Sequence, residues 1–170
     1  AIIGKNNDPR YIKEFFRDKQ RETTGEEELF GLPPRQHHKT NCSVRQQFIL
    51  HAALDRFEQV SGPQGAAWRA PGVSGTDAMW VGLLCPVEDR RVYGYMTTTQ
   101  IKFMLVVEDD ANVNDQRTVD ETIKRLFVKL HRIFLEYTLN PFSSLTGPIE
   151  SQRFDQKVSE CVSAYNRTIN

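Results

Sequence analysis

Three runs of strand-forming residues follow one another between residues 79 and 107, separated by two short turns. The runs are Met79–Cys85, Val92–Met96 and Ile101–Val107, and the turns are Glu88-Asp89-Arg90 and Thr97-Thr98-Thr99. Connections this short predict an antiparallel meander, because parallel strands need a crossover of a dozen or more residues. The third run is apolar at successive positions. It should therefore be covered on both faces or lie in the middle of its sheet.

The amino-terminal residues predict a hairpin that adds two strands to this meander. Ala1–Gly4 is a short apolar run, Asn6-Asn7-Asp8-Pro9 has the composition of a turn, and Tyr11–Phe16 has that of a partner strand. The sequence opens abruptly on Ala1-Ile2-Ile3 without an initiator Met. We therefore expect the first strand to have lost one residue or more from its beginning.

The segment between Ser43 and Gly62 has the apolar spacing of an amphipathic helix. Ser43 and Gln46 form a capping-box pattern at its start, and Gly62-Pro63 ends it. One broad apolar stripe consists of Ile49, Leu50, Ala53, Leu54, Phe57 and Val60. A second, mixed face consists of Val44, Phe48, His51, Ala52 and Asp55. A helix that covers a sheet needs only the first stripe, so the second face is covered either by a loop or by another protein.

Two further helices are predicted after the meander. Thr118 and Glu121 form a second capping-box pattern, and Asn140-Pro141 ends the helix that follows. Its apolar stripe consists of Val119, Ile123, Leu126, Phe127, Leu130, Ile133, Phe134 and Tyr137. Its opposite face is polar except for Val128 and Leu135, which form a second candidate patch for a partner. The last helix has a narrower stripe, consisting of Phe154, Val158, Cys161, Val162 and Tyr165.

The order of elements is therefore strand, strand, helix, three strands, helix, helix. This order predicts an α+β domain with a five-stranded antiparallel sheet and helices on its faces. Two stretches with little periodicity, at about 17–42 and 63–77, predict long loop insertions. We expect a single domain that spans residues 1–170.

Charge and cysteine content exclude several classes of partner. The chain has 22 Lys and Arg against 22 Asp and Glu, whereas general nucleic-acid binding and electrostatic attachment to an anionic membrane both need a basic surplus. Cys42, Cys85 and Cys161 are odd in number and far apart. This spacing predicts neither a disulfide framework nor a zinc site, and it favours a reducing compartment. No apolar run approaches the roughly 18 residues of a membrane span.

No residue pattern makes a convincing catalytic or metal site. Cys85 with His51 and Asp55 would supply a thiol nucleophile, a base and an orienting carboxylate, but an apolar strand favours a buried, inert thiol. An ion pair or hydrogen bond between His51 and Asp55 accounts for their spacing of one helical turn. His37-His38 and Glu108–Asp110 are interpreted as loop residues and solvated acidic residues. We therefore expect no catalytic residue, cofactor or metal.

Several sequence blocks, spread over most of the chain except the two long loops, carry a family resemblance. They are Ala52-Ala53-Leu54-Asp55, Trp80-Val81-Gly82-Leu83-Leu84-Cys85-Pro86-Val87-Glu88-Asp89, Val92-Tyr93-Gly94-Tyr95, Ile101-Lys102-Phe103, Phe127-Val128-Lys129-Leu130-His131, Asn140-Pro141-Phe142 and Ser151-Gln152-Arg153-Phe154-Asp155. In this order they resemble the small sedlin-like subunits of the TRAPP vesicle-tethering complexes.

The resemblance implies a longin-like, or profilin-like, fold with one helix on one face of the sheet and two on the other. It implies a complex that acts as a guanine-nucleotide exchange factor for Rab GTPases and tethers vesicles in ER-to-Golgi and intra-Golgi transport. Within it, this chain would be a non-catalytic adaptor that links the core to larger subunits. Its partners would be other TRAPP subunits and, indirectly, a Rab GTPase. Its location would be cytoplasmic, at the periphery of Golgi membranes.

In the family the first helix faces a neighbouring subunit. The resemblance therefore assigns the mixed face of Phe48, His51, Ala52 and Asp55, continued by Val44, to partner binding. Two other classes stay open. One is the longin domain of another trafficking adaptor, although a SNARE would need a coiled-coil segment that does not occur before Asn170. The other is a small thiol hydrolase that uses Cys85.

Overall fold

Among the residues that the structure describes, five strands form an antiparallel sheet in the order β2-β1-β5-β4-β3. The computed structural model describes residues 1–15, 44–61, 77–108, 116–144 and 146–169. The strands are β1 (Ile2–Ile3), β2 (Pro9–Tyr11), β3 (Trp80–Val87), β4 (Arg90–Met96) and β5 (Lys102–Glu108). The helices are α1 (Val44–Ser61), the 3-10 turn η4 (Asp77–Met79), α2 (Gln116–Thr138) and α3 (Gln152–Ile169).

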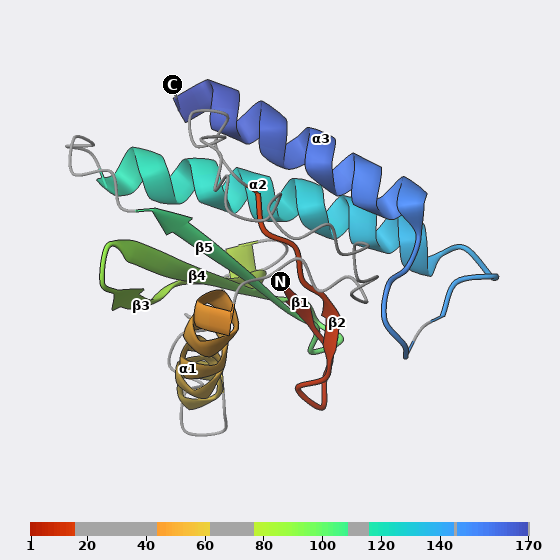
Figure 1. Cartoon of the computed structure of the whole chain (residues 1–170), viewed down its shortest axis with the longest axis horizontal. Coiled ribbons are helices and arrows are strands. Elements are labelled where there is room, and N and C mark those ends of the chain that lie inside the picture. The colour runs from red at the N-terminus through yellow and green to blue at the C-terminus, as the bar shows by residue number, and fades with distance from the viewer. Residues whose placement is uncertain (16–43, 62–76, 109–115, 145, 170) are drawn as a thin grey trace, which may run out of the picture.

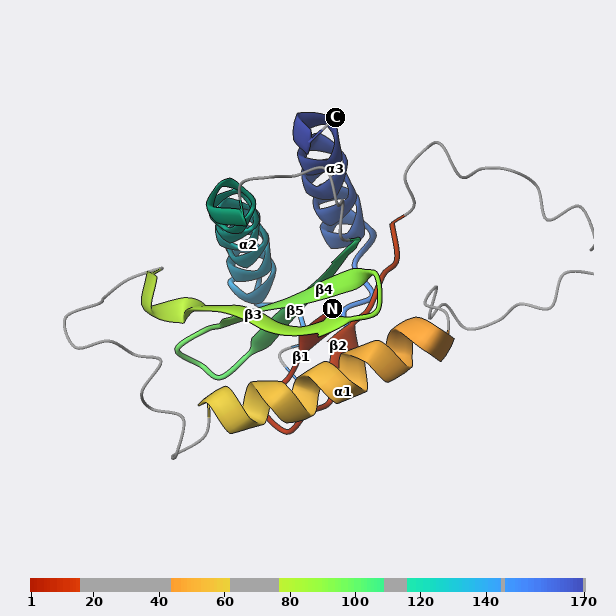
Figure 2. The same ribbon diagram turned by 90° about the vertical axis from the view of Figure 1, so that its left-hand side faces the viewer.

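The helices cover the two faces of the sheet unequally. Figure 2 shows α1 beneath the sheet and α2 and α3 side by side above it, and Figure 1 shows the same three layers from another side. Two separate hydrophobic cores result, one between α1 and the sheet and the other between the sheet and the pair α2 and α3. The α+β fold with one helix on one face and two on the other is confirmed.

The central strand β5 contributes side chains to both hydrophobic cores. Phe103 and Leu105 pack on the side of α2 and α3, whereas Met104 and Val106 pack on the side of α1. Successive side chains of a strand point to opposite faces, so a strand between two covered faces must be apolar at every position. The prediction that this run lies in the middle of the sheet is confirmed by the strand order.

Several expected boundaries are wrong, among them those of the second strand and of the second helix. The second strand is Pro9–Tyr11 rather than Tyr11–Phe16, and Ile3 pairs with Pro9. A proline is tolerated there because β2 lies at the edge of the sheet, where a missing N–H breaks no inner hydrogen bond. The helix expected to start at Thr118 begins two residues earlier, at Gln116.

Thr118 is therefore no N-cap, and its carbonyl oxygen accepts a hydrogen bond from the Thr122 hydroxyl inside the helix. The Gln116 side chain instead donates to the Tyr93 hydroxyl at 2.9 Å and to the Asp120 carboxylate at 2.7 Å. Ser43, Gly62-Pro63 and most of the two expected loops lie outside the described residues.

The connection between α2 and α3 is fastened to the amino-terminal hairpin by a buried arginine. Arg10 donates to the carbonyl oxygens of Ser144 and Gly147, and its guanidinium lies 5.7 Å from the centre of the Phe134 ring. The Ile149 amide donates back to the Arg10 carbonyl at 2.8 Å. Hydrogen bonds from a charged donor satisfy carbonyl groups that follow a helix end, so this connection is held in one position.

Candidate partner-binding surface

Helix α1 has one side buried in the lower core and the other facing outward. Its buried side chains are Ile49, Leu50, Ala53, Leu54 and Phe57, as the first apolar stripe predicts, and Val60 is partly buried. They pack against Ile3, Leu84, Val92, Met96 and Met104 of the sheet. The contact is close because Gly94 has no side chain: a Cβ there would lie 2.8 Å from the Phe57 ring.

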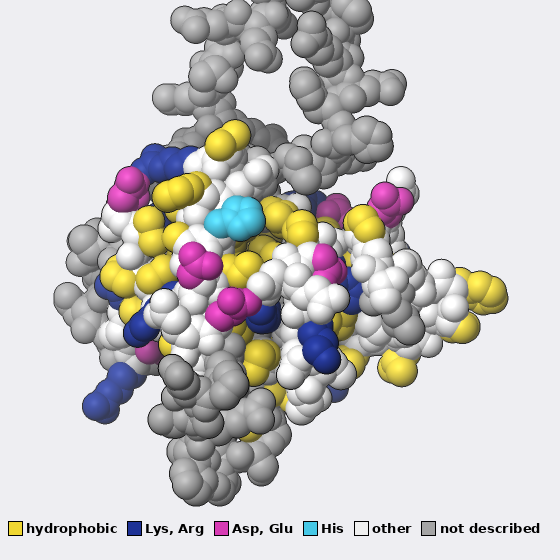
Figure 3. Space-filling view, turned by 90° about the horizontal axis from the view of Figure 1, so that it is seen from below, with side chains coloured by type: hydrophobic (Ala, Val, Ile, Leu, Met, Phe, Trp, Pro, Cys, Tyr) yellow, Lys and Arg dark blue, Asp and Glu magenta, His cyan; other side chains and the backbone are white. Residues whose placement is uncertain are grey.

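The opposite side of α1 exposes the mixed face that the sequence pointed to. Val44 and Phe48 are 82 % and 72 % exposed, and His51, Ala52 and Asp55 are exposed as well. Their spacing of four, three, one and three residues keeps all five on one side of a helix over about 16 Å. Seen from the side of α1, hydrophobic side chains lie around a histidine and several acidic side chains (Figure 3). We call these five residues the outer face of α1.

Two polar members of the outer face have no polar contact in the described part of the chain. Neither His51 nor Asp55 forms a hydrogen bond or ion pair there, so the expected local pair between them is wrong. Neighbouring polar side chains of α1 do have partners: Arg45 pairs with Glu88, and Arg56 donates to Gln59 at 3.1 Å. The outer face thus combines exposed apolar surface with polar groups that a partner can engage.

Both ends of α1 are tied to the rest of the fold. At the start, Arg45 pairs with Glu88 in the turn between β3 and β4. Near the end, Glu58 accepts a 2.5 Å hydrogen bond from Asn7 and lies 3.5 Å from the buried ammonium group of Lys102. These contacts lower the pKa of the Glu58 carboxyl, chiefly through the Asn7 hydrogen bond. The outer face is therefore displayed on a fixed helix.

The two residues of the second candidate patch, Val128 and Leu135, differ in how far they are buried. Val128 is partly buried, whereas Leu135 is 46 % exposed. Two residues that the apolar pattern of the helix did not reveal lie further on, Leu139 and Phe142, which are 81 % and 95 % exposed. The sequence carried a signal for one of them, because Phe142 belongs to one of the family-like blocks. The exposed surface here is Leu135 with the turn after α2, rather than the pair Val128 and Leu135.

The structure does not bring Cys85, His51 and Asp55 together as a catalytic group. Cys85 is partly buried against the core beneath the sheet, whereas His51 and Asp55 lie on the outward side of α1. Burial raises the pKa of the Cys85 thiol, and the nearby Arg56 opposes this only in part. A thiol with a raised pKa holds less of the thiolate that a nucleophile needs.

Among the helices that the structure describes, none is both long and apolar enough to cross a membrane. The described residues also contain no group of three or more His, Cys, Asp or Glu side chains placed to hold a metal ion. Of the acidic run at the end of β5, Glu108 is exposed, and Asp109 and Asp110 lie outside the described residues. His37 and His38 lie outside them too.

A five-stranded sheet with one helix on one face, two helices on the other and an exposed outer side on the single helix defines a small α+β domain. The model of the Sedlin family matches residues 2–164, and the chain belongs to that family. The expected sedlin-like resemblance is confirmed.

Curated relatives carry names of the same kind. The chain is 32 % identical over 162 residues to the trafficking protein particle complex subunit 2-like protein of Dictyostelium discoideum, covering 95 % of this chain and 93 % of that protein. It is 31 % identical over 159 residues to the protein of the same name from Xenopus tropicalis, covering 94 % and 91 %. Trafficking protein particle complex subunit 20 of Saccharomyces cerevisiae is 26 % identical over 175 residues, covering 93 % and 91 %.

Proposed function

We propose that this chain is a non-catalytic subunit of a trafficking protein particle complex and that it binds a neighbouring subunit through the outer face of α1. The observation that carries the proposal is the exposure of Val44 and Phe48 on a helix whose other side is fully packed. The names of the relatives, which are subunits of such a complex, support the assembly.

The remaining parts of the proposal follow from the family resemblance. One domain spans residues 1–170, acts as an adaptor between the core of the complex and larger subunits, and leaves nucleotide exchange on a Rab GTPase to other subunits. The chain is then cytoplasmic and reaches Golgi membranes through the complex. The balanced charge of the sequence supports contact with proteins rather than with phosphates.

The chemistry of the outer face favours a protein partner with a shallow apolar groove. Apolar anchors spaced along one side of a helix are the usual contact of a helix that lies in such a groove. Phe48 is the largest side chain of the face, and buried aromatic residues carry a large share of binding energy at interfaces. Asp55, which has no polar partner among the described residues, sets the polar contact at the far end of the face.

The test compares two exposed phenylalanines. Phe48→Ala should reduce the affinity for the neighbouring subunit at least about tenfold, which corresponds to a loss of about 1.4 kcal/mol of binding free energy. Phe142→Ala, the control, removes another exposed ring, which lies in the turn after α2, and should leave the affinity within about twofold. Asp55→Tyr should abolish co-purification with the partner subunit while leaving the circular dichroism spectrum unchanged.

Melting of the free chain distinguishes a protein partner from a covering loop. If another protein covers the outer face, Phe48→Ala leaves the melting temperature of the free chain within about 2 °C, because an exposed ring adds little to stability. A clear loss of melting temperature in the free Phe48→Ala chain would favour the covering loop. Normal assembly of both Phe48→Ala and Asp55→Tyr would refute the proposed docking face.

A further inference from the structure

The end of α2 and the connection to α3 expose three apolar side chains. Leu135 is 46 % exposed, Leu139 is 81 % exposed, and Phe142, at 95 %, is the most exposed large hydrophobic side chain that the structure describes. Figure 1 shows this connection projecting beyond the ends of both helices, at the opposite end of the helix pair from the C-terminus. We call Leu135, Leu139 and Phe142 the apolar tip.

The apolar tip is held in shape by hydrogen bonds of its own backbone. The Leu139 amide donates to the Leu135 carbonyl at 2.9 Å, so these two side chains lie on one side of a continuous helical turn. Asn140 then closes a β-turn: its carbonyl accepts from the Ser143 amide at 3.0 Å, and its side chain accepts from the Phe142 amide at 3.1 Å. A turn that is already fixed loses little conformational freedom when it binds.

Basic side chains lie behind the apolar tip. Lys129 and Arg132 are exposed on α2, and Arg153 is exposed in the first turn of α3. Within the described part of the chain, none of these three forms a hydrogen bond or an ion pair. Arg132 and Arg153 belong to different helices, yet both lie near Glu136, because each helps to lower the pKa of its carboxyl, which the hydrogen bond from Lys157 lowers most. The two helix ends therefore bring these cations together beside the tip.

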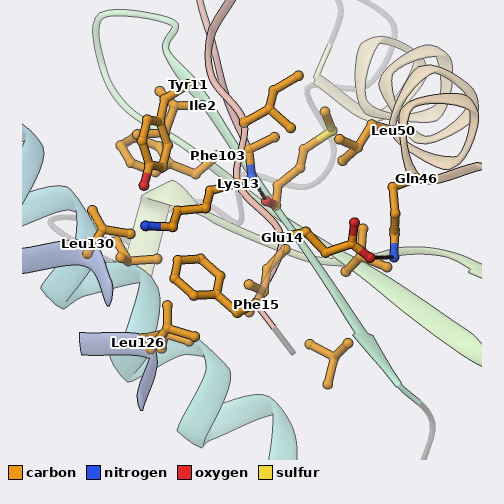
Figure 4. A pocket seen from close by; sticks show the side chains of 18 of the residues that line it. Ile2, Tyr11, Lys13, Glu14, Phe15, Gln46, Leu50, Phe103, Leu126 and Leu130 are labelled. Carbon is orange, nitrogen blue, oxygen red and sulfur yellow. Dashed lines mark hydrogen bonds between the residues drawn. The ribbon is translucent and has the colours of Figure 1, made fainter. Parts of the chain in front are cut away.

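Residues 128–158 contain three acidic side chains, of which two are paired with cations. Glu136 is paired as described above. Asp155 accepts hydrogen bonds from Lys13 at 2.6 Å and from the Tyr11 hydroxyl at 2.8 Å, and Figure 4 shows these two polar ends directed to the same side, toward the helices. Glu150 is exposed and has no polar partner among the described residues. Three unpaired cations against one unpaired carboxylate make this end locally basic, although the whole chain has no net charge.

We propose that the apolar tip inserts into the surface of an anionic lipid bilayer, with Lys129, Arg132 and Arg153 against the lipid phosphates. A bilayer offers both contacts in the order that the chain needs, with apolar acyl chains beneath a layer of negative headgroups. Arg132 lies about 10 Å behind Leu139 along the helix, a distance that the headgroup layer of one leaflet, roughly 5–8 Å, and a long basic side chain together span. The inference is independent of the proposed docking through α1.

The small size of the apolar tip favours a bilayer over a protein partner. A stable protein interface takes about 20–30 residues from each side, whereas a bilayer is bound by the insertion of a few apolar side chains aided by nearby cations. The zero net charge of the chain excludes attachment by charge alone, so insertion of the tip is required and the cations add to it. Binding through one such tip is weak and reversible, and it becomes firm when an assembly carries several membrane contacts.

The experiment measures sedimentation of the chain with lipid vesicles at low salt. The vesicles are phosphatidylcholine alone or phosphatidylcholine with about 30 % phosphatidylserine, at about 5 mM lipid. Partitioning should be at least about fivefold greater onto the anionic vesicles. The double variant Leu139→Ser, Phe142→Ser should lower it at least about tenfold, and Arg132→Gln with Arg153→Gln should lower it to the level of neutral vesicles.

A control variant separates the apolar tip from exposed apolar surface in general. Leu83→Ser changes a leucine of β3 that is 46 % exposed, as Leu135 is, and it should leave partitioning within about twofold. Because the substituted residues at the tip are exposed, their variants should melt within about 2 °C of the natural chain, which shows that a loss of partitioning is not a loss of folding.

Three outcomes would overturn the proposal. The first is unchanged partitioning of the Leu139→Ser, Phe142→Ser chain, and the second is equal partitioning of the natural chain onto neutral and anionic vesicles. The third is that neither the chain nor its assembled complex binds either kind of vesicle. If Phe142 is in addition shielded from hydroxyl radicals in the lipid-free complex, the tip binds a protein instead.

Discussion

At the scale of single residues, three polar side chains inside the fold each bind a specific partner. Arg10 binds two carbonyl groups of the connection after α2, and Lys102 binds Asn7 and Glu58 beneath the sheet. In the upper core, the Tyr95 hydroxyl lies 3.0 Å from Nδ1 of His131. Buried polar groups are costly unless they are paired, so these contacts fix the positions of the elements they join.

We expect the stability of the fold to depend on pH through His131. Burial lowers the pKa of its imidazole below the ordinary value of 6.5, so the unfolded chain binds the proton more readily than the folded chain. The free energy of unfolding should therefore fall as the pH drops below about 6.5, by at most about 1.4 kcal/mol per pH unit from this group.

His131→Gln removes this group and should reduce the dependence on pH. The measurement is urea unfolding of both chains at intervals between pH 5 and pH 8. The two chains should have the same slope of free energy against pH above 7, where the imidazole is neutral in both states. An unchanged slope below pH 6.5 in His131→Gln would show that the imidazole does not carry the effect.

At the scale of elements, the position of α1 depends on a close approach to β4. A Cβ at Gly94 would lie 2.8 Å from the Phe57 ring and 3.0 Å from the Leu84 side chain, both of which are buried. Real Cβ atoms essentially never lie as close as the shorter of these distances, so a larger residue requires the Phe57 or the Leu84 side chain to shift. Because Gly94 has no side chain, α1, which carries the outer face, can pack closely against β4.

Gly94→Ala should destabilise the chain by about 1–3 kcal/mol through overpacking, as measured by urea unfolding. Phe57→Leu alone should also destabilise it, because it removes part of a fully buried ring. If the clash is with Phe57, the double variant should be less destabilised than the sum of the two single variants. Strict additivity would place the cost of Gly94→Ala elsewhere.

The elements whose apolar period is long and regular could be predicted from the sequence. The central run of β5 and the inward stripe of α1 are where the pattern placed them, because burial on two faces or on one leaves a clear period. The second strand was placed too late, because only Pro9–Tyr11 pairs with β1 and the next residues bind helices instead. The start of α2 was misjudged because its first side chain, Gln116, is fixed by a tertiary contact to Tyr93.

At the scale of the whole molecule, the candidate surfaces for a partner are those that the two cores leave exposed. The outer face of α1 could be proposed from the sequence, because its residues lie between those of an apolar stripe that is buried against the sheet. The exposure of Leu139 and Phe142 could not, because it depends on how the connection after α2 is fastened by Arg10.

Hydroxyl-radical footprinting of Phe48 in the free chain and in the assembled complex tests the central claim most directly. Phe48 and Phe142 are both well exposed in the free chain, so both rings should be modified readily there. In the complex, modification of Phe48 should fall at least about fivefold relative to Phe142, since side chains at the centre of an interface are shielded from water. Equal modification of Phe48 in the free chain and in the complex would contradict binding through the outer face of α1.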